Sequence, residues 1–287
     1  MKKHLAVFFV LTALFTFNLT AAPVWKVSKG SNHVYLGGTM HLLSKSDYPL
    51  PAAFETAYKD SKKIVFEVDL ASVNSMEFVQ KLMIANMYMG DDDLTKHLKP
   101  ETIKKFKEFL KGRNMTLEPL KKMKPGFLTI MLATVEMQRM GMAEGGVDQF
   151  YNDKAVKDGK PVGALETVEE QLQFICNMGV GNEDELILHS IDEMDKIDEM
   201  MVDMKKAWRK GELSELDKVA LAEWKDEFPE LYKELLVDRN NNWMPQIKAM
   251  FGTKDVEFVL VGALHLSGKD GLLAKLKKAG YKVQKME

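Results

Sequence analysis

Apolar residues, either continuous or alternating with polar ones, recur along the chain in short runs that are typical of β-strands. These runs cover Val24 to Val27, His33 to Gly37, Lys63 to Val68, Pro161 to Leu165, Val256 to Val261 and Tyr281 to Gln284. The longer segments between them have apolar residues three or four positions apart, which is the spacing of amphipathic helices. This succession predicts an α/β fold with a central mixed sheet and helices on its faces.

The middle of the chain, from about residue 73 to residue 141, is predicted to be largely helical. Its apolar positions follow the helical period, and the sequences GDDDL, KPET and KPG supply the residues that begin and end helices. We expect this helical insertion to cover one side of the sheet. Residues 182–210 predict one long amphipathic helix, with apolar positions from Ile187 to Trp208.

Residues 1–22 have the pattern of a secretory signal peptide. Two lysines precede an apolar stretch that ends near Phe17, and the small residue Ala22 closes the segment. The stretch is short for a membrane span, and no later segment has eighteen uninterrupted apolar residues. We therefore expect a periplasmic or secreted protein, with one α/β domain over residues 23–287 and no stable membrane span after signal removal. Because Pro23 is unfavourable directly after a cleavage point, the alternatives are cleavage a residue or more away and a retained N-terminal anchor.

The charge balance and the cysteine content exclude some classes of function. The full chain has 40 basic and 42 acidic residues, and the predicted signal peptide carries two lysines and no acids. A mildly acidic chain argues against nucleic acid as the main partner. Cys176 is the only cysteine, which excludes an intrachain disulfide and a cluster of thiolate metal ligands.

A Gly-x-x-His-Leu motif occurs twice, each time at the end of a predicted strand. The copies are GTMHL, which contains His41, and GALHL, which contains His265. Ligands of α/β sheets bind beyond the carboxyl ends of the strands, so neighbouring strands can bring these two histidines together. For either histidine alone, the structural alternative is a side chain that only hydrogen-bonds to a neighbouring turn.

Two carboxylates also follow predicted strands. Glu67 lies near the end of KKIVFEVDL, where a buried carboxylate is costly unless it is paired, hydrogen-bonded or bound to a metal. Glu166 is the first charged residue after the fourth run, and a contact with the helix capped by Thr167 is its alternative role. Because two imidazoles are too few for a metal site, these carboxylates complete a candidate set of ligands with His41 and His265.

Arg239 and Asn240 are the remaining candidates. A helix through LLVDRNNNW places Arg239 one turn from Leu235 and from Trp243, on the apolar side of the helix, and Asn240 faces a similar way. A guanidinium buried there requires a carboxylate or an anionic ligand, whereas an exposed one is an ordinary surface arginine. Pro245 is expected to kink or restart this helix.

These motifs resemble those of the TraB/GumN family, which includes the Tiki proteases and plasmid pheromone-shutdown proteins. The matching stretches, in the family's order, are YLGGTMHLL, VFEVDL, GVDQFYNDKAVKDGKPVGALETVEEQL, DRNNNW and VGALHLSGKDGLLAKLKKAGYKV. The resemblance implies a fold related to erythromycin esterase and ChaN-like proteins, with the paired histidines and acidic residues at the active centre. Tiki-type members look like proteases that use a divalent metal ion, with manganese or cobalt favoured, whereas ChaN-like relatives bind haem.

The leading hypothesis is an exported hydrolase that acts on a peptide or a small molecule, and we expect it to be a peptidase. It is expected to depend on a divalent ion of manganese, cobalt or zinc. Carboxylates and the two histidines hold the ion, and a carboxylate left free acts as general base. Arg239 binds a substrate carboxylate or stabilises developing negative charge, with Asn240 in support. The alternatives are a non-enzymatic periplasmic binder of haem, metal or peptide, and a metal-free esterase-like hydrolase. The candidate metal ligands are His41, His265, Glu67 and Glu166, and the candidate catalytic residues are Glu67, Glu166, Arg239 and Asn240.

Overall fold

The structure of the protein is a computed structural model that describes residues 22–287. The predicted signal peptide therefore lies outside the described residues, apart from Ala22. Across the described range, every helix is too short or too polar to span a lipid bilayer.

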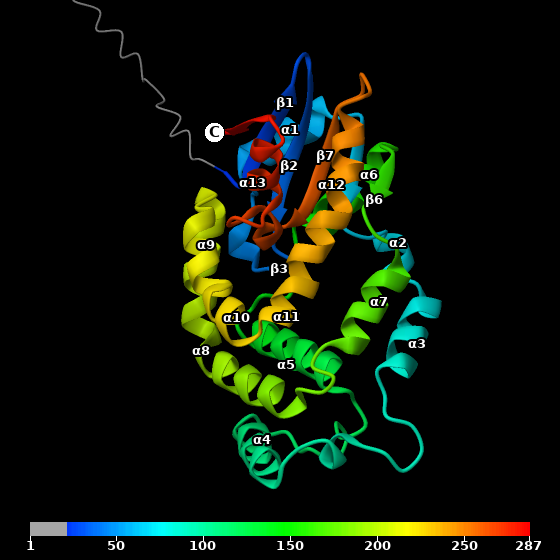
Figure 1. Cartoon of the computed structure of the whole chain (residues 1–287), viewed down its shortest axis with the longest axis vertical. Coiled ribbons are helices and arrows are strands. Elements are labelled where there is room, and N and C mark those ends of the chain that lie inside the picture. Colours follow the sequence, from blue (N-terminus) through cyan, green and yellow to red (C-terminus); the bar gives the residue numbers. More distant parts are fainter. Residues whose placement is uncertain (1–21) are drawn as a thin grey trace, which may run out of the picture.

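A mixed sheet with six strands forms one end of the molecule (Figure 1). Its strands, in their order across the sheet, are β6 (Val162–Ala164), β4 (Lys63–Phe66), β7 (Glu257–Gly262), β2 (Asn32–Thr39), β1 (Val24–Lys29) and β8 (Lys282–Lys285). The first four are parallel to one another, and β1 is antiparallel to both of its neighbours. These are the six strands that the apolar pattern predicts, so the α/β fold with a mixed sheet is confirmed.

Helices cover both faces of this sheet. Alternate side chains of β7 belong to different clusters: Phe258 and Leu260 pack with α1 (Ala52–Asp60) and α6 (Val147–Asp158), whereas Val259 and Val261 pack with α12 (Arg239–Met250) and α13 (Leu272–Lys278). Successive strand residues point to opposite faces. A strand buried on both faces has apolar residues at successive positions, which explains the continuous apolar run of β7 from Phe258 to Val261.

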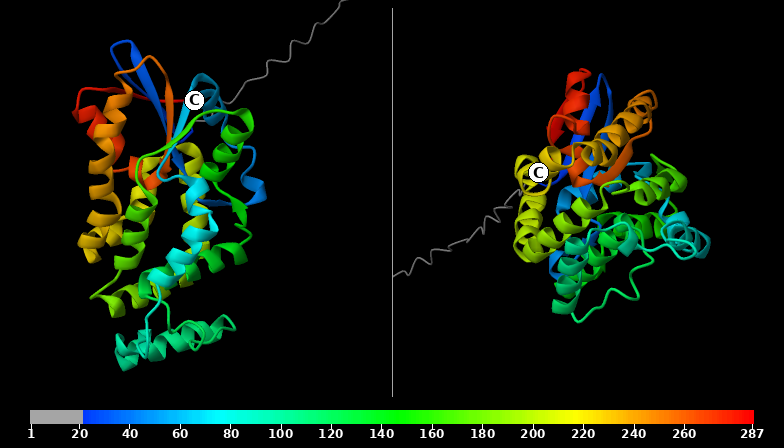
Figure 2. Two further views of the ribbon diagram at one scale, coloured as in Figure 1. Left: turned by 90° about the vertical axis from the view of Figure 1, so that its right-hand side faces the viewer. Right: turned by 60° about the horizontal axis from the view of Figure 1, so that its bottom comes forward.

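Most of the other helical segments lie beyond the carboxyl ends of the parallel strands, below the sheet in Figures 1 and 2. The segments of this part are α2 (Leu70–Val73), α3 (Met76–Ala85), η2 (Leu94–Lys96), α4 (Pro100–Gly112), α5 (Pro125–Arg139), α7 (Val168–Asn177), α8 (Glu183–Lys210), α10 (Ala222–Glu227), α11 (Pro229–Tyr232) and the π-helical segment Lys233–Asp238. Nearer the sheet lie η1 (Lys45–Asp47), α9 (Leu213–Ala220), η4 (Ala263–Leu266) and a two-residue strand pair, β3 (Leu42–Leu43) with β5 (Glu144–Gly145).

The helical insertion forms, but the expectation that it covers one side of the sheet is wrong. Side chains of α4 and α5 share a cluster with Ile187 and Met194 of α8, and α4 lies at the end of the molecule farthest from the sheet (Figure 2). The physical reason is that α1, α6, α12 and α13 already bury the two apolar faces of the sheet. The insertion therefore builds a second core on α8.

The helix α8 joins this second core to the sheet, and it is the long helix that the apolar spacing predicts. Its last turn buries Trp208, whose Nε1 donates a hydrogen bond to the carbonyl oxygen of Gly38 at 2.8 Å. Gly38 begins the first Gly-x-x-His motif, and a Cβ added there would lie 3.1 Å from the Cα of Ala263 in the second motif. The two motifs are therefore in direct contact, and α8 is anchored where they meet.

The variant Trp208→Phe tests this anchor. It removes the indole N–H from the buried Gly38 carbonyl, so we expect the free energy of unfolding to fall by about 1–3 kcal/mol, measured by urea denaturation. The matched control is Val202→Ala on the same helix, where the side chain is 64% exposed and the expected change is within about 0.5 kcal/mol. Equal stability of both variants would contradict the anchoring role of Trp208.

Candidate active site

Four of the candidate side chains lie at the carboxyl ends of four adjacent parallel strands. Glu166 follows β6 and Glu67 follows β4, whereas His265 follows β7 and His41 follows β2. Because these strands run in one direction, their ends meet at one edge of the sheet. The start of α12 adds Arg239 and Asn240 at the same edge, so the structure brings all six candidate residues together.

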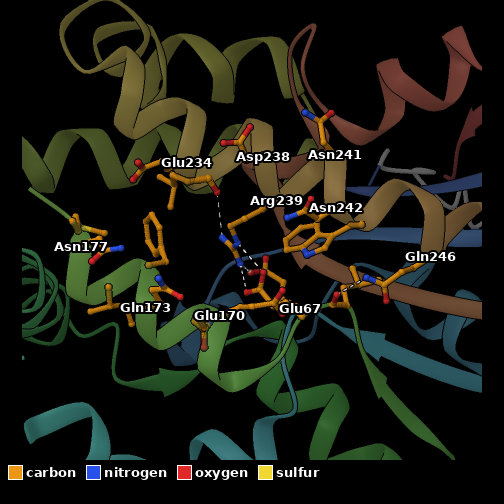
Figure 3. Close-up of a pocket in the computed structure, with 18 of the residues that line it drawn as sticks. Glu67, Glu170, Gln173, Asn177, Glu234, Asp238, Arg239, Asn241, Asn242 and Gln246 are labelled. Atoms are coloured by element: carbon orange, nitrogen blue, oxygen red, sulfur yellow. Dashed lines mark hydrogen bonds and ion pairs between the residues drawn. The ribbon is translucent and has the colours of Figure 1, made fainter. Parts of the chain in front are cut away.

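Arg239 lies at the centre of this cluster, and all five of its N–H groups are directed at acceptors of the protein. Its Nε and Nη2 donate to the two carboxylate oxygens of Glu166 at 3.0 and 2.7 Å. Nη2 also donates to Glu67 Oε2 at 2.6 Å (Figure 3). Nη1 donates to the Leu235 carbonyl at 3.3 Å and to His265 Nε2 at 3.1 Å. A guanidinium has five N–H donors, so these contacts leave none for a substrate. Arg239 is therefore a residue that positions its neighbours.

The ion pairs of Arg239 are buried. The side chains of Arg239, Glu67 and Glu166 are 16%, 10% and 7% exposed, and the guanidinium lies over the ring of Trp243. The sequence predicts that a guanidinium on this apolar side needs a carboxylate partner, and Arg239 has two, Glu67 and Glu166. Charges removed from water in this way are tolerated because they are paired, and losing one member leaves the others uncompensated.

Asn240 fixes the tautomer of His265. Its Nδ2 donates to the carbonyl oxygens of His265 and Asp270 at 3.2 and 3.0 Å, so its Oδ1 is the atom that faces the imidazole. Because Oδ1 can only accept, His265 Nδ1 at 2.8 Å carries the proton. Nε2 then has a lone pair, which accepts the N–H of Arg239. Burial lowers the pKa of His265 to about 4, so this ring is neutral at neutral pH.

His41 has a partner that the sequence analysis missed, Asp148 in the first turn of α6. His41 Nδ1 lies 3.1 Å from Asp148 Oδ2, and the charge of Asp148 raises the pKa of His41 to about 9. The His41 side chain is 67% exposed, in contrast to the buried ring of His265. His41 is thus a solvent-facing imidazole that a partly buried carboxylate orients and holds protonated at neutral pH.

Gly146 allows this pairing, because it brings the start of α6 against the segment after β2. Val147 N donates to the Met40 carbonyl at 3.1 Å, and a Cβ at Gly146 would lie only 2.0 Å from the same oxygen. Any side chain at this position would push the two segments apart. The available signal was the sequence GGVDQF, in which two glycines precede a helix start with an acid in its first turn.

Glu67 connects the buried and the exposed parts of the cluster. Its Oε1 accepts the N–H of Gly262 at 2.6 Å. Burial alone would raise the pKa of Glu67, but the positive charges of protonated His265, Arg239 and His41, together with this N–H, lower it to about 2. Since His265 is neutral at neutral pH, Arg239 and His41 keep Glu67 ionised there. For Glu166 the balance is opposite, because burial raises its pKa in spite of Arg239.

A cleft of about 900 Å³ opens onto this cluster. One wall is α7, and the π-helical segment with α12 forms the other wall (Figure 3). A smaller cavity of about 210 Å³ adjoins the cleft, and His41, Glu67 and Gln171 line both. Carboxamides and carboxylates dominate the polar lining of the cleft: Gln171, Gln173, Asn177, Asn241, Asn242, Gln246, Glu170, Glu234 and Asp238.

Three of the four predicted metal ligands are turned toward Arg239, and His41 is paired with Asp148, so the four do not converge on one point. The carboxylates of Glu67 and Glu166 meet at Nη2, whereas His265 Nε2 contacts Nη1. Nowhere in residues 22–287 are three or more His, Cys, Asp or Glu side chains placed so that they could hold a metal ion. These residues therefore do not fit a divalent ion in this arrangement, and the ion stays a prediction.

The helix that carries Arg239 is irregular, but not where the sequence indicates. Pro245 lies inside α12 and does not restart the helix there. The irregular turn is the π-helical segment, which ends at Asp238, directly before Arg239. Such wide turns are rare and occur often at functional sites. The position of Pro245 did not predict this π-helical segment.

Comparison with known proteins gives one family match. The model of the TraB/PrgY/gumN family matches residues 23–285. Neither curated proteins nor solved structures yield a match to the chain.

The variant Asp148→Asn tests the cause of the raised pKa of His41. Without the carboxylate charge, we expect the pKa of His41 to fall from about 9 toward the ordinary value of about 6.5, measured by NMR titration of the imidazole nitrogens. The matched control is Asp153→Asn, an exposed acid on the same helix, which should leave the titration unchanged. The same His41 pKa in wild type and Asp148→Asn would contradict the pairing.

The neutral, buried His265 should make the protein less stable in acid. Its pKa is about 4 in the folded chain and about 6.5 when exposed, so between these pH values the unfolded chain binds a proton that the folded chain does not. The free energy of unfolding should therefore decrease as the pH falls from 6.5 to 4, by up to about 1.4 kcal/mol per pH unit. Urea denaturation across this range measures the loss. It should be smaller in His265→Gln, and equal losses in both proteins would refute this assignment.

Proposed function

The chain belongs to the TraB/PrgY/gumN family, and on that premise we propose that it is a hydrolase with its reaction centre at His41, Asp148 and Glu67. The observation that carries the proposal is the pair of Asp148 and His41, which line the smaller cavity together, with His41 also lining the cleft. A carboxylate that holds Nδ1 leaves Nε2 to exchange a proton with substrate or water, which is the arrangement of a general acid–base histidine.

Glu67 Oε1 and His41 Nε2 both lie beside Gly262, where a Cβ would be 3.2 Å from the first atom and 3.9 Å from the second. We place the attacking water between these two side chains, in the cavity of about 210 Å³ that both of them line. There it can contact the carboxylate and the imidazole together. Glu67 Oε2 accepts an N–H of Arg239 and Oε1 accepts the N–H of Gly262, so its role is to orient the water and to stabilise the imidazolium, and the proton goes to His41.

The reaction follows from these positions. Neutral His41 takes a proton from the water through Nε2 while the water oxygen forms a bond to the carbonyl carbon of the substrate. When the tetrahedral intermediate collapses, the bond to the leaving group breaks and the same proton passes from Nε2 to that group. Because the pKa of His41 is about 9, the neutral form grows as the pH rises toward this value. Arg239, Asn240 and His265 position Glu67 and exclude water from its buried side.

The cleft favours a peptide as the substrate. Carboxamides face it from both walls, with Gln173 and Asn177 on α7 and Asn242 on α12 (Figure 3). Each carboxamide offers a donor and an acceptor, which matches the N–H and C=O groups of a peptide main chain. Export is part of the proposal and is supported by the pattern of residues 1–22.

The kinetic test uses a pool of fluorogenic peptides as the substrate. His41→Ala should lower kcat/KM by about 100-fold or more, since it removes the proton-transfer group. Asp148→Asn should move the pH limb that titrates near 9 to lower pH, and Asp153→Asn serves as the unchanged control. Full turnover by folded His41→Ala would contradict the proposed role.

Two further outcomes separate this proposal from the alternatives. The steps above use no metal ion, so activity should survive exhaustive dialysis against a chelator; loss of activity that manganese, cobalt or zinc restores would establish the metal-dependent hydrolase. Stoichiometric binding of peptide or haem with no turnover of any peptide or ester would establish the non-enzymatic binder.

A further inference from the structure

We propose that the guanidinium of Arg239 is the resident cation of this centre and competes with divalent metal ions for Glu67, Glu166 and His265. These three residues are the buried part of the set that the sequence predicts as metal ligands. Each directs an electron pair at Arg239: two carboxylates at Nη2 and Nε, and a neutral imidazole at Nη1. The chemistry of the donors suits a metal, but a side chain of the protein already holds them.

The spacing of the donors is that of hydrogen bonds. The oxygens of Glu67 and Glu166 lie 2.6 and 2.7 Å from Nη2, and His265 Nε2 lies 3.1 Å from Nη1. A zinc ion needs oxygen and nitrogen ligands at about 2.0–2.2 Å around one point. To form such a shell, the three side chains would have to leave the three guanidinium nitrogen atoms that they contact and close on a single centre. A metal ion can therefore bind them only after Arg239 withdraws.

Several contacts oppose that withdrawal. Glu166 holds the guanidinium with two parallel hydrogen bonds, Leu235 accepts another N–H, and the ring of Trp243 lies 4.8 Å from the guanidinium carbon. An arginine does not lose its proton in proteins, so a change of pH does not remove this competitor. The apparent affinity for a metal ion equals the intrinsic affinity multiplied by the fraction of molecules in which Arg239 is withdrawn, so a small fraction gives weak binding.

Which cation the buried donors hold does not depend on the proposed hydrolase activity. Its test measures metal binding, whereas the test of the function measures turnover. Either proposal can fail while the other holds.

The first experiment titrates the metal-free mature protein with manganese chloride or zinc chloride in a calorimeter. Compared with wild type, Arg239→Gln should bind the ion at least about tenfold more tightly, because the competing cation is gone. In that background, Glu67→Gln should abolish the gain, which locates the ion at the buried carboxylates.

The matched control is Arg113→Gln, in the second core. Arg113 also lies over an aromatic ring, Phe109, and also bridges two carboxylates, those of Glu136 and Asp195. Its removal changes the net charge equally and leaves the proposed site intact. It should not change the affinity of the site for the metal ion.

A second variant keeps the test decisive if Arg239→Gln does not fold. Arg239→Lys retains the charge with three donors in place of five, so its affinity for the ion should lie above that of wild type. In the wild type, NMR of the arginine Nε–H reports the same competition, because added zinc should shift the Arg239 signal as its contact with Glu166 is lost.

The outcomes are distinct. A tighter complex in the variants, with a shift of the Arg239 signal in the wild type, supports the proposal. A wild-type protein that binds one ion tightly while its Arg239 signal is unchanged overturns it. Weaker or equal binding in Arg239→Lys, or in folded Arg239→Gln, overturns it as well.

Discussion

The buried charge of Arg239 is the constraint on which the whole centre depends. Two buried carboxylates at neighbouring strand ends would repel each other, and each would be costly to remove from water without a partner. One guanidinium, with five donors in a fixed plane, satisfies both carboxylates and also the lone pair of His265. Everything else at this edge of the sheet is arranged around that planar group, from the amide that sets the His265 tautomer to the indole ring that lies against it.

The fold supplies this arrangement through parallel strands and close backbone contacts. Four parallel strands end at one edge, so residues distant in the sequence become neighbours there. Glycines then remove the volume that would separate the segments: Gly38 lies against the second histidine motif, Gly146 against the segment that carries His41, and Gly262 beside Glu67. The repeated motif therefore contributes in two ways, because its histidine places an imidazole at the sheet edge and its glycine permits close packing.

The centre has a hydrogen-bonded inner half and an open outer half. In the inner half, the side chains of His265, Glu166 and Arg239 are at most 16% exposed, and their polar atoms contact one another or Asn240. In the outer half, His41 faces the cleft with only Nδ1 committed, to Asp148. The histidines of the two motif copies consequently differ in charge at neutral pH. Burial lowers the pKa of His265, whereas the carboxylate of Asp148 raises the pKa of His41. The outer half is suited to proton transfer, and the inner half holds it in place.

The sequence by itself determined the strands, the class of fold, the family and six of the residues at the sheet edge, because alternation, strand ends and short motifs are local properties. It indicated that a buried Arg239 needs carboxylates, but not that two carboxylates, an imidazole and the Leu235 carbonyl would together use all its donors. It did not indicate Asp148, whose partner lies 107 residues away, or the packing of the helical insertion on α8. Only the tertiary structure decided these points, since which donors and acceptors meet, and which apolar faces remain uncovered, depend on the relative placement of segments that are distant along the chain.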